Sequence, residues 1–348
     1  MISILILFTI VYIYSFGANR LKNGPIQGSN YLSVETTSTI KGIFVVLIFA
    51  SHFSSYVQYQ AFYDTSLKNV CSFLGQLIVI PFLFYSGYGV YESFKKKGES
   101  YIHNFPKRRI FKVLLHFDLA VLIYFIINQI TGIDYPLQQT LLSLIAWEDI
   151  GNSNWFIFAI LLTYLFTYIA FSITTKPLKS ISIITFLTLS YIVILYFAKK
   201  GEPWWWNTVI SYPMGMLFSY YKTQIENTCF KSKRISVILL TSILILFILL
   251  KTTSIPIYIF QTLSLSILFT MFLPLWSWFM PAQNQILIWL GKNVFGVYIL
   301  QRIPMNLLKD TPISENVYLY FSLCIIITIT LTIVFQKVTD WIDFRLKI

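Results

Sequence analysis

The sequence predicts an all-α polytopic membrane protein with about eleven transmembrane helices, and its composition and apolar runs carry that prediction. Hydrophobic residues make up 56% of the 348 residues, whereas only 11% are charged. A soluble domain usually carries about 25% charged residues, because its surface must face water. Here the apolar residues gather in runs of roughly 16 to 22, long enough to cross the hydrocarbon core. A bilayer interior offers no partners to exposed backbone groups, so such runs form helices.

The first apolar run is expected to be a retained helix rather than a cleaved signal peptide, because its positive charges follow the run instead of preceding it. Residues 1–35 then form an N-terminal transmembrane helix with a cytoplasmic loop, and residues 36–348 hold the other ten predicted helices. The predicted helices lie near 2–16, 40–57, 73–91, 110–130, 155–173, 181–198, 204–221, 235–250, 255–280, 286–308 and 316–335.

The net charge of +12 is distributed unevenly between the predicted loops. Eighteen of the 26 lysines and arginines fall on one predicted side of the membrane, and the other side holds only Lys68, Lys199, Lys200, Lys251 and Lys309. Cytoplasmic loops of membrane proteins are enriched in lysine and arginine. The asymmetry therefore predicts insertion in the cytoplasmic membrane, with the N-terminus outside and the C-terminus in the cytoplasm. It also explains the basic charge without a nucleic-acid partner.

His52 is an ionisable residue inside a predicted helix, where such groups are costly and often functional. Lys41 precedes it by eleven residues, and eleven steps of about 100° come within about 20° of three whole turns. The two side chains therefore share one helix face, about 16 Å apart along the axis. A neutral imidazole suits general-base work on a hydroxyl. The alternative is a histidine that hydrogen-bonds between helices, with Lys41 extending its amine to the membrane surface.

A basic loop is predicted on the cytoplasmic side at residues 92–109. Arg109 and Lys112 lie three residues apart at the start of the next helix, so they share a face. Clustered guanidinium and ammonium groups suit a ligand that is rich in phosphate. The alternative is that the loop only anchors the protein to anionic lipid headgroups.

Two further groups of residues are candidate sites, whereas the three cysteines are not. Ser86 lies among small residues in a predicted helix, where it either lines a cavity or allows close helix packing. On the predicted outer side, Asn154 and Trp155 combine an amide with an indole, a mixture that can hold a sugar by hydrogen bonding and ring stacking. The three cysteines are expected at different depths, so neither a disulfide nor a metal site is predicted.

Several of these residues, in this order along the chain, resemble the membrane-bound acyltransferase family 3, which includes bacterial polysaccharide O-acetyltransferases. The resemblance covers roughly residues 36–310. Its pieces are Lys41 and His52, which resemble a basic-x10-His motif; Phe84-Tyr85-Ser86-Gly87; Arg109 and Lys112, which resemble an Arg-x-x-Arg motif; Trp155-Phe156; Leu290-Gly291-Lys292; and Val297-Tyr298-Ile299-Leu300.

The resemblance implies a ten-helix acyltransferase core, so that residues 36–348 would be the acyltransferase domain and the first helix an addition. It also implies a cytoplasmic acyl-coenzyme A donor, with His52 as the catalytic centre and Lys41, Arg109 and Lys112 at the donor phosphates. The chain departs from the family pattern at Lys41 and Lys112, where arginine is usual. Lysine keeps the positive charge but lacks the planar guanidinium that binds an anion through two hydrogen bonds. Gln301 stands where a histidine is common.

We therefore expect an acyltransferase of the cell envelope, with acetyl-coenzyme A or another acyl-coenzyme A as co-substrate. The expected reaction is O-acetylation of a cell-surface polysaccharide or its lipid-linked precursor, with Ser86 near the donor and no metal. The alternatives are a transporter or flippase for lipid-linked saccharides, which would need more cationic helix faces, and a glycan polymerase, which usually carries a larger external loop. A non-catalytic sensor remains open because of Gln301.

Overall fold

The computed structural model describes residues 31–58, 65–253, 257–279 and 281–348, and within these ranges the chain is helical, with no strand. The predicted helix at 2–16 lies outside the described residues. The helical elements are α2 (Val34–Phe53), α3 (Thr65–Leu74), η2 (Gly75–Val79), α4 (Ile80–Lys97), α5 (Glu99–His103), η3 (Pro106–Phe111), α6 (Lys112–Thr131), α7 (Leu137–Ser143), α8 (Trp155–Ile173), α9 (Pro177–Ala198), η4 (Pro203–Trp205), α10 (Ser211–Tyr220), α11 (Lys222–Cys229), α12 (Lys233–Thr252), α13 (Tyr258–Phe279), α14 (Gln285–Lys292), α15 (Val294–Leu300), α16 (Arg302–Leu308), η5 (Pro312–Glu315) and α17 (Val317–Leu346).

Among the described residues, eight helical segments are long and apolar enough to cross a membrane. They are Val34–Phe53, Lys68–Lys97, Pro106–Thr131, Trp155–Ile173, Pro177–Ala198, Lys233–Thr252, Tyr258–Phe279 and Val317–Leu346. The segment predicted at 286–308 is broken instead of continuous: Gln285–Lys292 and Val294–Leu308 meet at 69°, and together they would make a ninth span. The multi-pass helical architecture is confirmed, but the number eleven is not.

The segment predicted as a helix at 204–221 differs most from the structure. It forms the short turn η4 and the ten-residue helix α10, which is too short to cross a bilayer. Every residue from Trp205 to Pro213 is buried by protein. The segment is apolar because it packs in the core of the bundle, not because it faces lipid, and composition by itself does not separate these two cases.

Two pairs of helices cross at backbone contact, each through a pair of glycines. A Cβ atom on Gly42 of α2 would lie 2.1 Å from the carbonyl oxygen of Leu287, and one on Gly291 of α14 would lie 1.8 Å from that of Ser38. The same holds for α4 and α10, where a Cβ on Gly87 would lie 2.0 Å from the Tyr212 carbonyl oxygen. Small residues permit such close approach between membrane helices. These crossings place Lys41, Ser86 and Lys292 next to the tightest points of the bundle.

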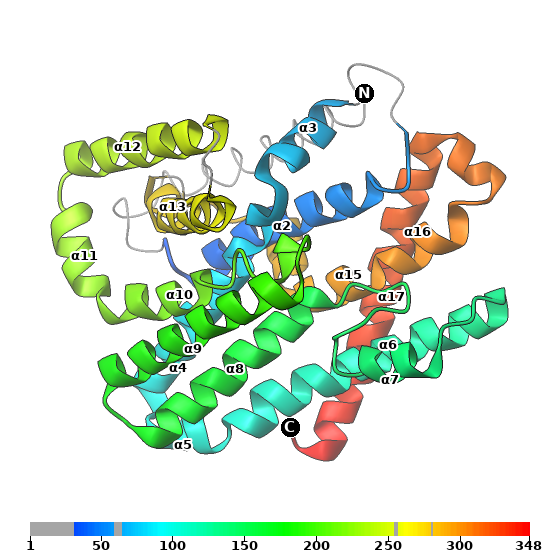
Figure 1. Cartoon of the computed structure of the whole chain (residues 1–348), viewed down its shortest axis with the longest axis horizontal. Coiled ribbons are helices and arrows are strands. Elements are labelled where there is room, and N and C mark those ends of the chain that lie inside the picture. The colour runs from blue at the N-terminus through cyan, green and yellow to red at the C-terminus, as the bar shows by residue number, and fades with distance from the viewer. Residues whose placement is uncertain (1–30, 59–64, 254–256, 280) are drawn as a thin grey trace.

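The C-terminal end of α17 lies beside the beginning of α6 (Figure 1). The Asp343 carboxylate forms ion pairs with Lys112 Nζ at 2.5 Å and with His116 Nε2 at 2.9 Å. The two ends are therefore on the same side of the bundle. This agrees with the sequence, which predicts that the 92–109 loop and the C-terminus share one side of the membrane.

Because one spanning helix, Pro106–Thr131, separates them, the segments before and after α6 should lie on opposite sides of the membrane. Ser100 and Gln138 are exposed positions on these two segments. Single cysteines there, in a protein whose native Cys71, Cys229 and Cys324 are replaced by alanine, should react oppositely with an impermeant thiol reagent. Gln138→Cys should react in intact cells, and Ser100→Cys only after lysis. The reverse pattern would invert the predicted orientation, and reaction of both in intact cells would refute the crossing itself.

Candidate active site

The predicted donor residues Lys41, Ser86 and Arg109 line one cavity of about 640 Å³, here called the cationic cavity. Lys96 and Lys292 also line it, and Glu92 is the single carboxylate that the described residues contribute to its wall. Glu92 is already paired: its carboxylate lies 2.5 Å from Lys95 Nζ and accepts a hydrogen bond from the Ser219 hydroxyl at 2.6 Å. The lysines and the arginine of the cavity wall therefore leave an excess of positive charge. The rest of the wall is largely aromatic and apolar.

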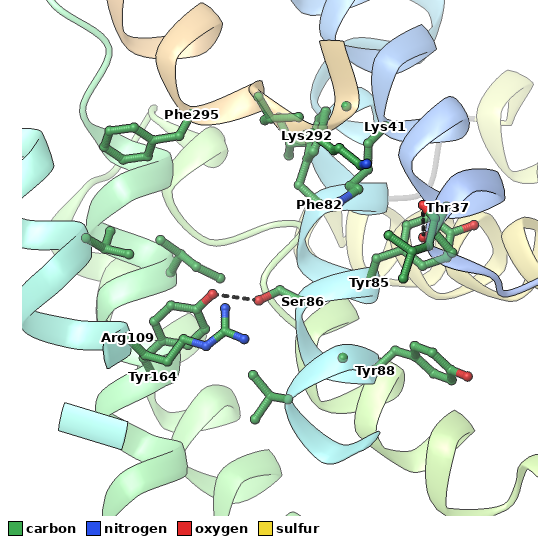
Figure 2. A pocket seen from close by; sticks show the side chains of 18 of the residues that line it. Thr37, Lys41, Phe82, Tyr85, Ser86, Tyr88, Arg109, Tyr164, Lys292 and Phe295 are labelled. Atoms are coloured by element: carbon green, nitrogen blue, oxygen red, sulfur yellow. Dashed lines mark hydrogen bonds between the residues drawn. The ribbon is translucent and has the colours of Figure 1, made fainter. Parts of the chain in front are cut away.

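Arg109 reaches this cavity from η3, a π-helical turn that precedes α6. π-Helical turns are rare and are frequent at functional sites, because the extra residue redirects the side chains around it. Figure 2 shows the Arg109 guanidinium next to the hydrogen bond between the hydroxyls of Ser86 and Tyr164, whose oxygens are 2.9 Å apart. Lys41 and Lys292 lie together at another part of the wall (Figure 2).

His52 lines a second cavity of about 450 Å³, here called the histidine cavity. The wall is rich in hydroxyl and amide groups, with Ser51, Ser72 and Gln76 beside the apolar face of Trp155. His52 Nδ1 is buried and makes no hydrogen bond with any described residue. An imidazole that is not committed to a structural bond, facing a polar cavity, can take a proton from a bound hydroxyl.

The two cavities meet at Ile48, Val79 and Tyr298, which line both of them. Lys41 and His52 belong to the same helix, α2, and each faces one cavity. The predicted spacing of about 16 Å along this helix therefore separates two cavities, and these three side chains lie at the boundary between them.

A family model described as an acyltransferase domain, that of acyltransferase family 3, matches residues 38–337. The chain belongs to this family. A search of curated proteins and a search of solved structures each gave no significant match. The resemblance expected from the sequence is confirmed, and family membership implies a membrane acyltransferase. The matched range begins within α2 and includes all residues of the histidine cavity and all residues of the cationic cavity except Leu32, Val34 and Thr37.

The structure places the other predicted site residues less uniformly around the two cavities. Trp155 lines the histidine cavity, whereas Asn154 lines neither cavity. Its Nδ2 donates to the Ala146 carbonyl oxygen at 3.2 Å, so in this conformation it holds the loop before α8. The sequence indicated an amide beside an indole, but only the indole faces the cavity.

Lys112 also lies outside the cationic cavity. It pairs with Asp343 and lines a third cavity of about 670 Å³, here called the loop cavity, which borders the cationic cavity at Arg109 and Lys292. Lys97 and Arg108 add further positive charge there. Arg109 and Lys112 thus both line the loop cavity, but only Arg109 also lines the cationic cavity.

Gln301, the departure from the family pattern, has a structural contact. Its Nε2 donates to the Tyr298 carbonyl oxygen at 3.0 Å, and the side chain is buried. It lines neither the cationic nor the histidine cavity. The glutamine therefore supports the backbone of α15 and faces neither of these two cavities.

Three residues of the cationic cavity were not predicted as site residues from the sequence: Lys292, Tyr164 and Tyr298. A signal existed for Lys292, because it is a charged residue within a predicted apolar helix. Tyr298 was visible only as part of a family landmark. Tyr164 had no signal, since a tyrosine in an apolar run usually packs with its neighbours; only the fold brings its hydroxyl to Ser86.

Proposed function

We propose that this acyltransferase moves an acyl group, expected to be acetyl, from cytoplasmic acyl-coenzyme A to a hydroxyl of a cell-surface glycan or lipid-linked saccharide in the cytoplasmic membrane. The observation that carries the proposal is the meeting of the cationic cavity and the histidine cavity at Ile48, Val79 and Tyr298. A two-substrate transfer needs such an arrangement, with each substrate in its own space and the reacting atoms at the boundary.

The donor assignment rests on charge and on the lining of the cationic cavity. Coenzyme A carries phosphates at one end, and Arg109, Lys41, Lys96 and Lys292 offer cationic partners for them. In this proposal the loop cavity adds Lys112 to the same phosphate-binding region, with its ammonium group already held by Asp343. The aromatic wall, including Phe82 and Phe156, suits the less polar arm that carries the thioester.

The acceptor assignment rests on the histidine cavity. Hydroxyl and amide groups surround His52, and the indole of Trp155 offers a flat apolar surface. Sugars are bound by this combination, because their hydroxyls exchange hydrogen bonds while their C–H faces stack on aromatic rings. His52 would take the proton of the acceptor hydroxyl as its oxygen attacks the thioester.

The test is acyl transfer by the purified full-length protein in detergent, with acetyl-coenzyme A labelled in the acetyl group. Release of free coenzyme A together with label in added glycan or lipid-linked saccharide would support the proposal. Release that requires no acceptor would indicate hydrolysis instead. Retention of all label on coenzyme A, while the protein still transports a fluorescent lipid-linked saccharide across vesicles, would favour a flippase and overturn the proposal.

Arg109 gives a specific prediction for the donor. Arg109→Gln should weaken coenzyme A binding about ten- to hundredfold, since a hydrogen bond to a charged group contributes about 1.5–3 kcal/mol. The loss should shrink at high salt, because ions screen partly exposed charges. Lys112→Gln should show a smaller loss, since its ammonium group is already paired with Asp343. Calorimetry with coenzyme A across salt concentrations would measure both.

Lys107→Gln is the matched control for Arg109→Gln. Lys107 belongs to the same π-helical turn but is exposed and lines none of the three cavities. It should keep the affinity of the unmodified protein. Equal losses for Lys107→Gln and Arg109→Gln would mean that the loop attracts the donor only through its total charge, and the assignment of Arg109 would be wrong.

A further inference from the structure

Tyr298 has a buried hydroxyl that the fold leaves without a hydrogen bond. Its side chain is only 4% exposed, and its oxygen makes no hydrogen bond with any of the described residues. Ser153 and the Phe156 backbone are polar neighbours that interact favourably with this oxygen, although neither reaches the distance and angle of an ordinary hydrogen bond. A buried polar group without a partner destabilises a protein, so such groups often mark a functional site.

The position of Tyr298 indicates a function for this hydroxyl. Tyr298 is one of the three residues that line both cavities, and it is the only one of the three with a polar side chain. Its ring centroid lies 6.1 Å from that of His52 and 5.7 Å from that of Phe156. The unused donor therefore sits where the two proposed substrates would meet, beside the proposed base.

The helix that carries Tyr298 is held firmly. Gly296 packs so closely on α17 that a Cβ atom would lie 2.8 Å from the Thr332 methyl group. The Tyr124 hydroxyl donates to the Ile299 carbonyl oxygen at 2.9 Å, and Gln301 donates to the carbonyl of Tyr298 itself. A donor fixed in advance in a place of low polarity stabilises developing charge without reorganisation.

We infer that Tyr298 is a catalytic residue whose hydroxyl donates a hydrogen bond to the thioester carbonyl oxygen during transfer. This inference rests on the proposed function. The acceptor oxygen forms a C–O bond to the carbonyl carbon while His52 takes the hydroxyl proton, and negative charge develops on the carbonyl oxygen next to Tyr298. The C–S bond then breaks, the electron pair leaves with sulfur, and the proton passes from His52 to give the free thiol of coenzyme A.

Tyr298→Phe tests the inference, because it removes only the oxygen. In the labelled transfer assay, kcat should fall about 10²- to 10³-fold, the range for loss of one oxyanion donor. The affinity for coenzyme A should stay within about twofold, and the thermal midpoint should not fall, since the hydroxyl has no partner to lose. A merely structural role would lower the thermal midpoint and would not reduce kcat selectively.

Tyr191→Phe is the matched control. Tyr191 is a buried tyrosine of α9 that lines none of the three cavities, and its hydroxyl donates to the Trp205 carbonyl oxygen at 2.6 Å. It should lose some thermal stability and keep its kcat within about threefold. If Tyr298→Phe keeps the kcat of an active wild-type protein, or loses kcat only together with stability, the inference is wrong. Absence of transfer in the wild-type protein would instead refute the proposed function, so the two failures are distinguishable.

Discussion

Replacing His52 with alanine should lower the rate of acyl transfer about 10²- to 10⁴-fold, the usual contribution of a positioned general base. His52 faces the polar cavity next to Tyr298, and its Nδ1 is not used in any structural hydrogen bond among the described residues. Its loss should therefore leave folding and coenzyme A affinity nearly unchanged. Initial rates with labelled acetyl-coenzyme A, beside calorimetry with coenzyme A, measure the two effects separately.

His103→Gln serves as the comparison for His52→Ala. His103 is an exposed histidine at the end of α5, and it lines none of the three cavities. It should keep the wild-type rate. Wild-type turnover in a correctly folded His52→Ala protein would falsify the assignment of His52, and a matching fall in donor affinity would make His52 a binding residue instead.

Replacing Gly87 with alanine should destabilise the bundle by about 2 kcal/mol or more, near the upper end of the usual 1–3 kcal/mol for overpacking. The new methyl group would lie 2.0 Å from the Tyr212 carbonyl oxygen, so α4 and α10 would have to separate. Since Ser86 is the preceding residue, the separation should also disturb its hydrogen bond with Tyr164 and weaken donor binding. Heating in detergent followed by size-exclusion chromatography measures the loss of folded protein.

Gly89→Ala is the control for Gly87→Ala. Gly89 lies two residues further along the same helix, and nothing lies within 4 Å of a Cβ atom placed there. Alanine is preferred over glycine in a helix by about 1 kcal/mol. This change should be neutral or slightly stabilising. Equal thermal midpoints for Gly87→Ala and Gly89→Ala would show that α4 and α10 do not meet as closely as described.

The sequence predicted the spanning helices well where lipid is their environment. The segment 155–173 begins and ends as expected, and 181–198 differs only by an earlier start at Pro177. Hydropathy succeeds there because a lipid-facing helix must be apolar along its whole length. It fails for 204–221, where the same apolarity comes from burial among other helices. It also misses the 69° break between α14 and α15, since both halves remain apolar.

For the active site, the sequence by itself determined which residue types are unusual at membrane depth. Lys41 and His52 stand out because a charged or titratable group within a lipid-spanning helix is costly, and one helix period places them on one face. That each of them lines its own cavity was not predicted. Arg109 and Lys112 were predicted to share a helix face from their spacing in the basic loop, and the family resemblance added their motif.

Only the tertiary structure decided how these residues are combined. The π-helical turn directs Arg109 to the cationic cavity, while Asp343 of α17 holds Lys112 away from it. Helix crossings through glycine pairs bring Lys292 to the cavity of Lys41, from more than 200 residues along the chain. The fold also buries the Tyr298 hydroxyl without giving it a hydrogen-bond partner among the described residues. Apolar runs and charge are local properties of a chain, whereas hydrogen-bond partners and cavity walls come from segments that meet only after folding.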